Sequence, residues 1–97
     1  MDLTPLPPAS TLAPLIFDIE TDGLLSSMTR IHCGVILDTA SGIFTRYGPT
    51  DIGQMVHILS STNRPLMGHN VINFDIPAIQ KLYPKFQPKA LPLDTLI

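Results

Sequence analysis

Two carboxylates separated by one residue stand in a short apolar segment near the start of the chain. Asp18 and Glu20 belong to the run Leu15-Ile16-Phe17-Asp18-Ile19-Glu20, and Glu20 is the only glutamate in the sequence. Residues i and i+2 of a strand point to the same face, so these carboxylates are expected about 7 Å apart. Like charges on an apolar strand favour a neutralising cation, and hard oxygen ligands suit Mg²⁺ or Mn²⁺. The alternative is a solvent-exposed edge strand with an alternating polar face.

A third carboxylate, Asp75, follows the short segment that ends at Gly68. The run Gly68-His69-Asn70-Val71-Ile72-Asn73-Phe74-Asp75 places it in the first turn of a predicted helix, directly after a predicted strand. Ligands of α/β sheets bind beyond the strand ends, so this position is suited to chemistry. The alternative is that Asp75 only stabilises the helix through its dipole.

Five strands and two helices are expected to position these groups. The predicted strands cover residues 15–20, 31–38, 43–47, 65–68 and 93–97. A tight turn at residues 40–42 favours an antiparallel meander for the first three strands. Thr50 and Asn73 are expected to be the helix N-caps. The first helix has an apolar face made of Ile52, Met55, Val56 and Leu59.

The order of these elements predicts an α/β fold built on a mixed sheet. Three antiparallel strands come first, and helical crossovers then lead to parallel strands. Because the sequence stops directly after the last predicted strand, we expect a domain truncated before its last helices, with one sheet face uncovered. The proline-rich residues 1–13 are expected to form a disordered leader.

Composition limits the classes of function. The 97 residues form one domain at most, and only 14 % are charged, against roughly 25 % in ordinary soluble domains. The net charge of −2 argues against binding of nucleic acid through the overall charge of the chain. The single cysteine, Cys33, excludes an internal disulfide and is expected in the core. Without an apolar run of about 18 residues, we expect a cytoplasmic chain with no membrane partner.

The residues around the carboxylates resemble a known nuclease family. Phe17-Asp18-Ile19-Glu20-Thr21-Asp22-Gly23-Leu24 is similar to the first motif of the DEDD 3′–5′ exonucleases of the RNase H-like superfamily. His69-Asn70 followed by Phe74-Asp75 is similar to their second motif. The segment 31–36 and the late Asp94-Thr95-Leu96 resemble the proofreading domain of phage family A DNA polymerases. The resemblance implies that residues 14–97 are part of an RNase H-like exonuclease domain carrying the first two motifs only.

This resemblance implies two-metal hydrolysis of the 3′-terminal phosphodiester of DNA. Asp18, Glu20 and Asp75 would be both the catalytic residues and the metal ligands, and two Mg²⁺ (or Mn²⁺) ions would occupy the complete domain. The location would be the host cytoplasm if a phage encodes the chain.

The same resemblance implies that Leu24, His69 and Asn70 contact the substrate, a single-stranded 3′ end of DNA. A core position for Leu24 is the alternative, as is a purely structural role for His69 and Asn70 in the strand-to-helix turn. The further partner implied is the rest of a polymerase chain or a second subunit.

The family's fourth carboxylate has no counterpart in this sequence. It belongs to a Tyr-x₃-Asp or His-x₄-Asp motif on a later helix, whereas Tyr83 is followed four residues later by Gln87. Asp94 has Ala90 four positions before it, so it matches the intervening Asp-Thr-Leu segment instead. We therefore expect an N-terminal fragment of a proofreading exonuclease, inactive or weak alone.

Two alternatives remain open at this point. The chain could be a non-catalytic remnant or split-gene product that serves as a metal-binding, nucleic-acid-binding or assembly module. It could also be a fragment of an RNase T-like or oligoribonuclease-like exonuclease acting on RNA, because the first two motifs do not distinguish DNA from RNA.

Overall fold

The computed structural model describes residues 13–95. The elements in chain order are β1 (Leu15–Thr21), β2 (Ile31–Asp38), β3 (Phe44–Tyr47), α2 (Ile52–Ser61), β4 (Leu66–Gly68), η1 (Val71–Asp75), α3 (Ile76–Leu82) and β5 (Leu93–Asp94). The predicted strands and helices are therefore confirmed within a few residues at their ends. The disordered leader predicted for residues 1–13 lies outside the described residues except at Ala13, and so does the end of the last predicted strand.

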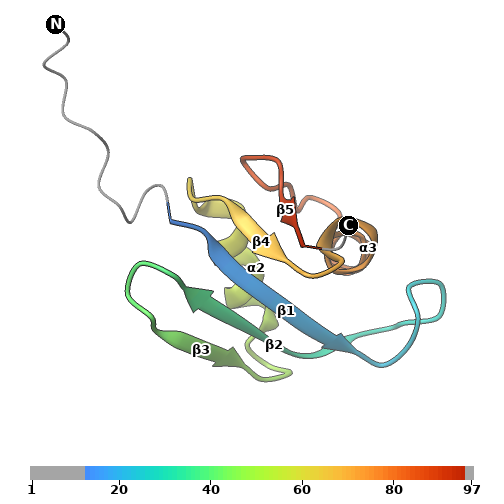
Figure 1. Cartoon of the computed structure of the whole chain (residues 1–97). Helices are drawn as coiled ribbons and strands as arrows, with labels where there is room; N and C mark the ends of the chain where they lie inside the picture. Colours follow the sequence, from blue (N-terminus) through green and yellow to red (C-terminus); the bar gives the residue numbers. More distant parts are fainter. Residues whose placement is uncertain (1–12, 96–97) are drawn as a thin grey trace, which may run out of the picture.

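The strands form one mixed sheet in the order β3-β2-β1-β4-β5. β1 pairs antiparallel with β2, and β2 pairs antiparallel with β3. β4 lies parallel to β1 on its other side, and β5 is parallel to β4. Figure 1 shows β1 at the centre of the sheet, with α2 behind it and α3 beside its C-terminal end. The prediction of three antiparallel strands followed by helical crossovers to parallel strands is thus confirmed.

Alternation along β1 separates an apolar face from a polar one. Leu15, Phe17 and Ile19 are each 5 % exposed or less, whereas Asp18 and Glu20 are exposed. Successive side chains of a strand point to opposite faces, so the two carboxylates share the face opposite Ile19. This confirms the predicted orientation of Asp18 and Glu20.

The core lies between the apolar face of the sheet and the two helices. The predicted apolar stripe of α2 is confirmed, because its buried residues are Ile52, Met55, Val56 and Leu59. Met55 packs so closely against Gly34 of β2 that a Cβ at this glycine would clash with the methionine sulfur. α3 adds Ile76, Ala78 and Ile79 to the same core cluster.

The opposite face of the sheet carries exposed or half-buried side chains in the described part of the chain. Paired residues of neighbouring strands share a face, so Cys33 lies next to Glu20, and Arg46 follows Val35 and Asp18 in one row. Cys33 is exposed, and the prediction that it lies in the core was wrong. The strand alternation that buries Gly34 and Ile36 necessarily turns Cys33 outward.

Both predicted helix caps were wrong. α2 begins after Asp51 rather than after Thr50, and Asp51 makes no side-chain capping bond. The second helical segment starts before Asn73, as the π-helical turn η1, and Asn70 precedes it in the left-handed conformation with φ of 59°. Pro77 lies in the first turn of α3, directly after η1.

The corner between β4 and η1 is crowded. A Cβ added to Gly68 would clash with the Val71 side chain and lie 2.7 Å from the Phe17 carbonyl oxygen. Only glycine lets β4 approach β1 this closely just before the chain turns. The corner thereby brings the residues after β4 alongside the C-terminal half of β1.

Candidate functional site

Asp75 is a buried carboxylate at the edge of β1. It is 3 % exposed, and its Oδ2 accepts a hydrogen bond from the Ile19 N–H at 3.2 Å. β4 pairs with β1 only at Leu15 and Ile16, so the Ile19 amide lies beyond the paired part of that edge. The Asp75 carboxylate therefore occupies the position where a longer β4 would have continued the ladder.

The surroundings of Asp75 oppose its ionisation. Burial is the largest cause, and with the nearby negative charges of Asp18 and Asp94 it raises the pKa of Asp75 to about 7. The hydrogen bond from Ile19 acts in the other direction but does not cancel the effect. A carboxylate held close to another one in an apolar setting is a charge arrangement that a cation would relieve.

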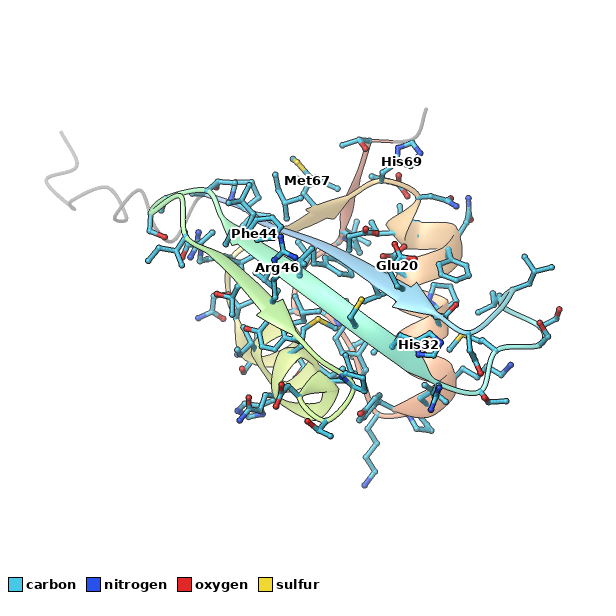
Figure 2. All side chains as sticks on the ribbon, turned by 90° about the horizontal axis from the view of Figure 1, so that it is seen from below. Glu20, His32, Phe44, Arg46, Met67 and His69 are labelled. Carbon is cyan, nitrogen blue, oxygen red and sulfur yellow. The ribbon has the colours of Figure 1, made fainter. Side chains whose placement is uncertain are left out.

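Asp18 and Glu20 stand on the exposed face beside this position. Figure 2 shows Glu20 and His69 toward the end of the sheet where β1 stops, and Phe44, Arg46 and Met67 toward the end where β1 begins. No lysine or arginine among residues 13–95 forms an ion pair with Asp18, Glu20 or Asp75. Within the described residues, the predicted catalytic carboxylates therefore have no lysine or arginine as an ion-pair partner.

The donor chemistry suits Mg²⁺ or Mn²⁺, but the geometry is only partly that of a metal centre. Asp18 and Asp75 are close enough to interact electrostatically, and both offer hard oxygen ligands. Within residues 13–95, no three His, Cys, Asp or Glu side chains converge in an arrangement that could hold a metal ion. The structure therefore brings Asp18 and Asp75 together, and Glu20 does not complete a three-ligand cluster with them.

Leu24 lies at an exposed loop beyond β1. Its side chain is 75 % exposed, so the alternative of a core position does not apply. Asp22 closes the loop, because its carboxylate accepts the Thr29 N–H at 2.8 Å, the Arg30 N–H at 3.1 Å and the Thr29 hydroxyl. These bonds hold the pKa of Asp22 well below its usual range.

His69 and Asn70 occupy the corner between β4 and η1. His69 is exposed, and its Nδ1 lies 3.4 Å from the Thr95 hydroxyl. Asn70 takes the left-handed conformation that non-glycine residues rarely adopt, and its carbonyl accepts the Phe74 N–H at 3.0 Å. The corner gives Asn70 a clear structural role, while His69 stays accessible from solvent.

The role of Asp94 in this region was not predicted from the sequence. Its Oδ1 accepts the Asn70 N–H at 2.8 Å, and its Oδ2 accepts the Ile72 N–H at 2.9 Å. The available signal was an aspartate near the start of the last predicted strand, residues 93–97. Nothing local to Asp94, however, pointed to two amides more than 20 residues earlier.

The opposite end of the sheet carries a paired aspartate. Arg64 donates from Nη1 and Nη2 to the two carboxylate oxygens of Asp38, both at 2.7 Å, and from Nε to the Ala13 carbonyl at 2.8 Å. This bidentate contact holds the pKa of Asp38 well below its usual range.

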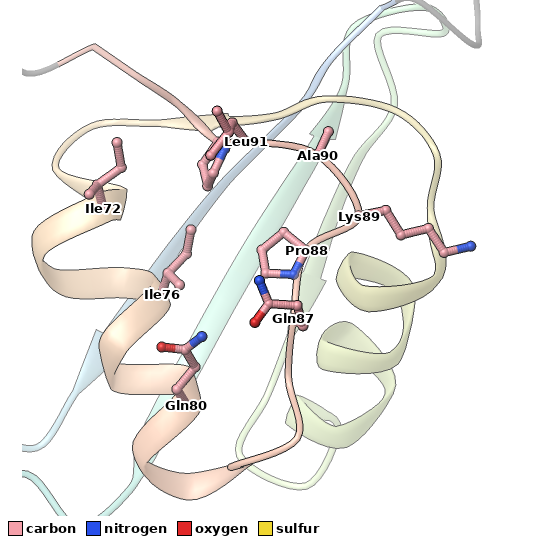
Figure 3. A pocket seen from close by; sticks show the side chains of 9 residues that line it. Ile72, Ile76, Gln80, Gln87, Pro88, Lys89, Ala90 and Leu91 are labelled. Carbon is pink, nitrogen blue, oxygen red and sulfur yellow. The ribbon is translucent and has the colours of Figure 1, made fainter.

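A cavity of about 520 Å³ lies between α3 and the loop that follows it. Figure 3 shows Ile72, Ile76 and Gln80 along one side and residues 87–91 along the other. None of the predicted site residues lines it. Among residues 13–95 there is also no helix long and apolar enough to cross a membrane.

The chain is similar to part of two phage DNA polymerases. Over 71 residues it is 35 % identical to the DNA-directed DNA polymerase of Escherichia phage T7 and 37 % identical to that of Enterobacteria phage T3. Each match covers 70 % of this chain but only 10 % of the polymerase. No protein-family model matches the chain. The comparisons thus relate this chain to a short region of phage DNA-directed DNA polymerases.

Proposed function

We propose that the chain is the first part of an RNase H-like 3′–5′ proofreading exonuclease belonging to a phage-type DNA polymerase. The observation that carries the proposal is the pairing of Asp18 on the central strand with buried Asp75 at the start of α3, without a basic partner among the described residues. The similarity to two phage polymerases supports the same assignment.

Asp18 and Asp75 would hold a divalent cation, and Glu20 would contribute from the same strand face. When bound, such a cation neutralises the carboxylates and polarises the phosphodiester. The chain itself supplies the fixed positions: the β1 backbone holds Asp18, and the Ile19 amide holds the Asp75 carboxylate at 3.2 Å. Leu24, which is exposed at its loop, and His69, which is also exposed, would contact the 3′-terminal nucleotide of a single strand of DNA.

The remainder of a polymerase chain or a second subunit is the partner that this function requires. The family's fourth carboxylate is absent from the sequence, so a further ligand would have to come from that partner. Because misplacing reacting groups by about 1 Å can cost about 100-fold in rate, the 97 residues alone should hydrolyse DNA very poorly.

The test is Mg²⁺-dependent release of mononucleotides from a 3′-labelled single strand of DNA. The chain alone would be compared with a version extended by a helix that carries a Tyr-x₃-Asp motif, each with and without D18A. The matched control is D51N, which changes an exposed aspartate at the start of α2. Activity in the extended chain that is lost in D18A and kept in D51N is expected, whereas activity that survives D18A would overturn the assignment.

A second candidate is a non-catalytic module that binds nucleic acid or helps assembly. The lack of a three-ligand metal cluster among residues 13–95 favours it. It predicts binding of single-stranded DNA that is equal in wild type and D18A and insensitive to Mg²⁺. The exonuclease proposal predicts that Mg²⁺ changes this binding only in the wild type. An RNA strand of the same sequence, assayed in parallel, tests the RNase T-like or oligoribonuclease-like reading.

A further inference from the structure

The first turn of η1 is closed by a side chain from another strand. The amides at the start of a helix lack partners within the helix, and a neighbouring side chain usually caps them. Asn70, which precedes η1, makes no side-chain capping bond. The two oxygens of Asp94 accept the Asn70 and Ile72 amides instead, at 2.8 and 2.9 Å.

Asp94 is itself fixed to the sheet. Asp94 pairs with Gly68 in the parallel β4–β5 ladder. The N–H of the next residue, Thr95, donates a hydrogen bond to the Gly68 carbonyl at 2.9 Å. The carboxylate therefore connects the backbone of the sheet to the beginning of η1. At the other end of η1, Asp75 returns to the sheet through the Ile19 amide at 3.2 Å.

We infer that Asp94 is a positioning residue for Asp75. By holding both amides at the start of the five-residue turn Val71–Asp75, it determines where the carboxylate at the end of that turn meets β1. The inference rests on the proposed function only where Asp75 is to bind a cation. The link from Asp94 to the Ile19 amide is independent of any metal.

Amide hydrogen exchange of the substitution D94N in the 97-residue chain tests the link. Asparagine keeps the size of the side chain but offers one acceptor oxygen and sets an NH₂ group against the other amide. Exchange at the Ile19 amide is expected to accelerate about tenfold, together with exchange at Ile72 or Asn70. Alternate peptide groups of a strand face opposite neighbours, so the Asp18 and Glu20 amides, which face β2, should keep their rates.

The control D51N removes a charge of the same type far from η1 and should leave all these rates unchanged. A uniform acceleration along β1 in D94N, or an unchanged Ile19 amide, would overturn the inference. If D94N does not fold, scalar couplings across hydrogen bonds are measured in the wild type. Coupling from the Asn70 and Ile72 amides to the Asp94 carboxyl carbon is expected, and its absence alongside the Asp75–Ile19 coupling would overturn the inference.

Mn²⁺ titration of the same variants separates the two proposals. D94N is expected to bind Mn²⁺ at least tenfold more weakly than wild type and D51N, because residues that orient ligands have effects of this size. If the Ile19 amide responds to D94N while Mn²⁺ binding is equal in both proteins, the positioning role stands and the proposed cation site fails.

Discussion

An aspartate from another element lies near each end of β1, and folding shifts the pKa values of these two aspartates in opposite directions. At the end where β1 begins, Asp38 meets Arg64 in a bidentate contact with both distances at 2.7 Å, and its pKa is lowered. At the end where β1 stops, Asp75 is buried next to Asp18, its carboxylate accepts a hydrogen bond from the Ile19 N–H, and its pKa is raised to about 7.

The contact between Asp38 and Arg64 stabilises the folded state, whereas the burial of a charged Asp75 destabilises it. A lowered carboxylate pKa means that the folded state favours the charged form, which is the behaviour of a structural ion pair. A raised pKa means that folding works against the charge, and the cost lasts unless something outside the described residues neutralises it. Sites with such costs are candidates for binding and catalysis, and this is why the proposed function is placed at the Asp75 end.

The largest expected effect comes from crowding the corner that carries Asp75. G68A adds a methyl group against the Phe17 carbonyl and the Val71 side chain, and a backbone oxygen cannot move aside. We expect a loss of about 3 kcal/mol in the free energy of unfolding, the upper end for overpacked sites. Urea unfolding measures it. G53A is the matched control, since the nearest atom there is the Tyr83 hydroxyl at 4.0 Å, and it should leave stability equal or slightly higher.

The next effect is a pH dependence that D75N should remove. In the folded state the pKa of Asp75 is about 7 instead of 3.8, so folding takes up a proton between these values and stability falls as the pH rises through them. From about pH 5 to about pH 8 in the presence of a chelator, wild type should lose about 2 kcal/mol more than D75N. Parallel stability curves for the two proteins would show that Asp75 ionises without cost.

The smallest effect is expected at the contact between Asp38 and Arg64, and its pH dependence has the opposite sign to that of Asp75. R64K keeps the positive charge but loses the bidentate geometry with Asp38. Its melting temperature is expected to lie below that of wild type at neutral pH. The difference in melting temperature should shrink as the pH falls below 3.8, the ordinary pKa of an aspartate. The reason is that the contact with Arg64, which lowers the pKa of Asp38, stabilises only the charged form of this aspartate. Calorimetric melting across this pH range checks it, and a gap that widens in acid would contradict the account.

The same contrast explains how much the sequence could predict. Alternation in Leu15–Thr21 and the heptad-like spacing of Ile52, Met55, Val56 and Leu59 are local patterns, and they predicted β1, α2 and the shared face of Asp18 and Glu20. The order of elements likewise predicted the mixed sheet, because short turns and crossovers leave few arrangements.

Features that depend on distant contacts were not predictable in this way. Asn73 has the residue type of a cap, but η1 starts earlier because Asp94 supplies acceptors from another strand. Cys33 was expected in the core from its residue type, and the register with Glu20 turned it outward. The burial of Asp75 and its contact with Ile19 also arise only when β4 stops short of the end of β1.

Paramagnetic broadening by Mn²⁺ tests whether the end of β1 where Asp18 and Asp75 lie is a cation site. Amide signals of the 97-residue chain would be followed during addition of substoichiometric Mn²⁺ at about pH 8, where Asp75 is mostly ionised. A cation site at this end predicts broadening of Ile19, Glu20 and residues 72–76, loss of that broadening in D18A, and unaffected signals around Asp38. Broadening that is equal at both ends of β1, or that persists in D18A, would contradict it.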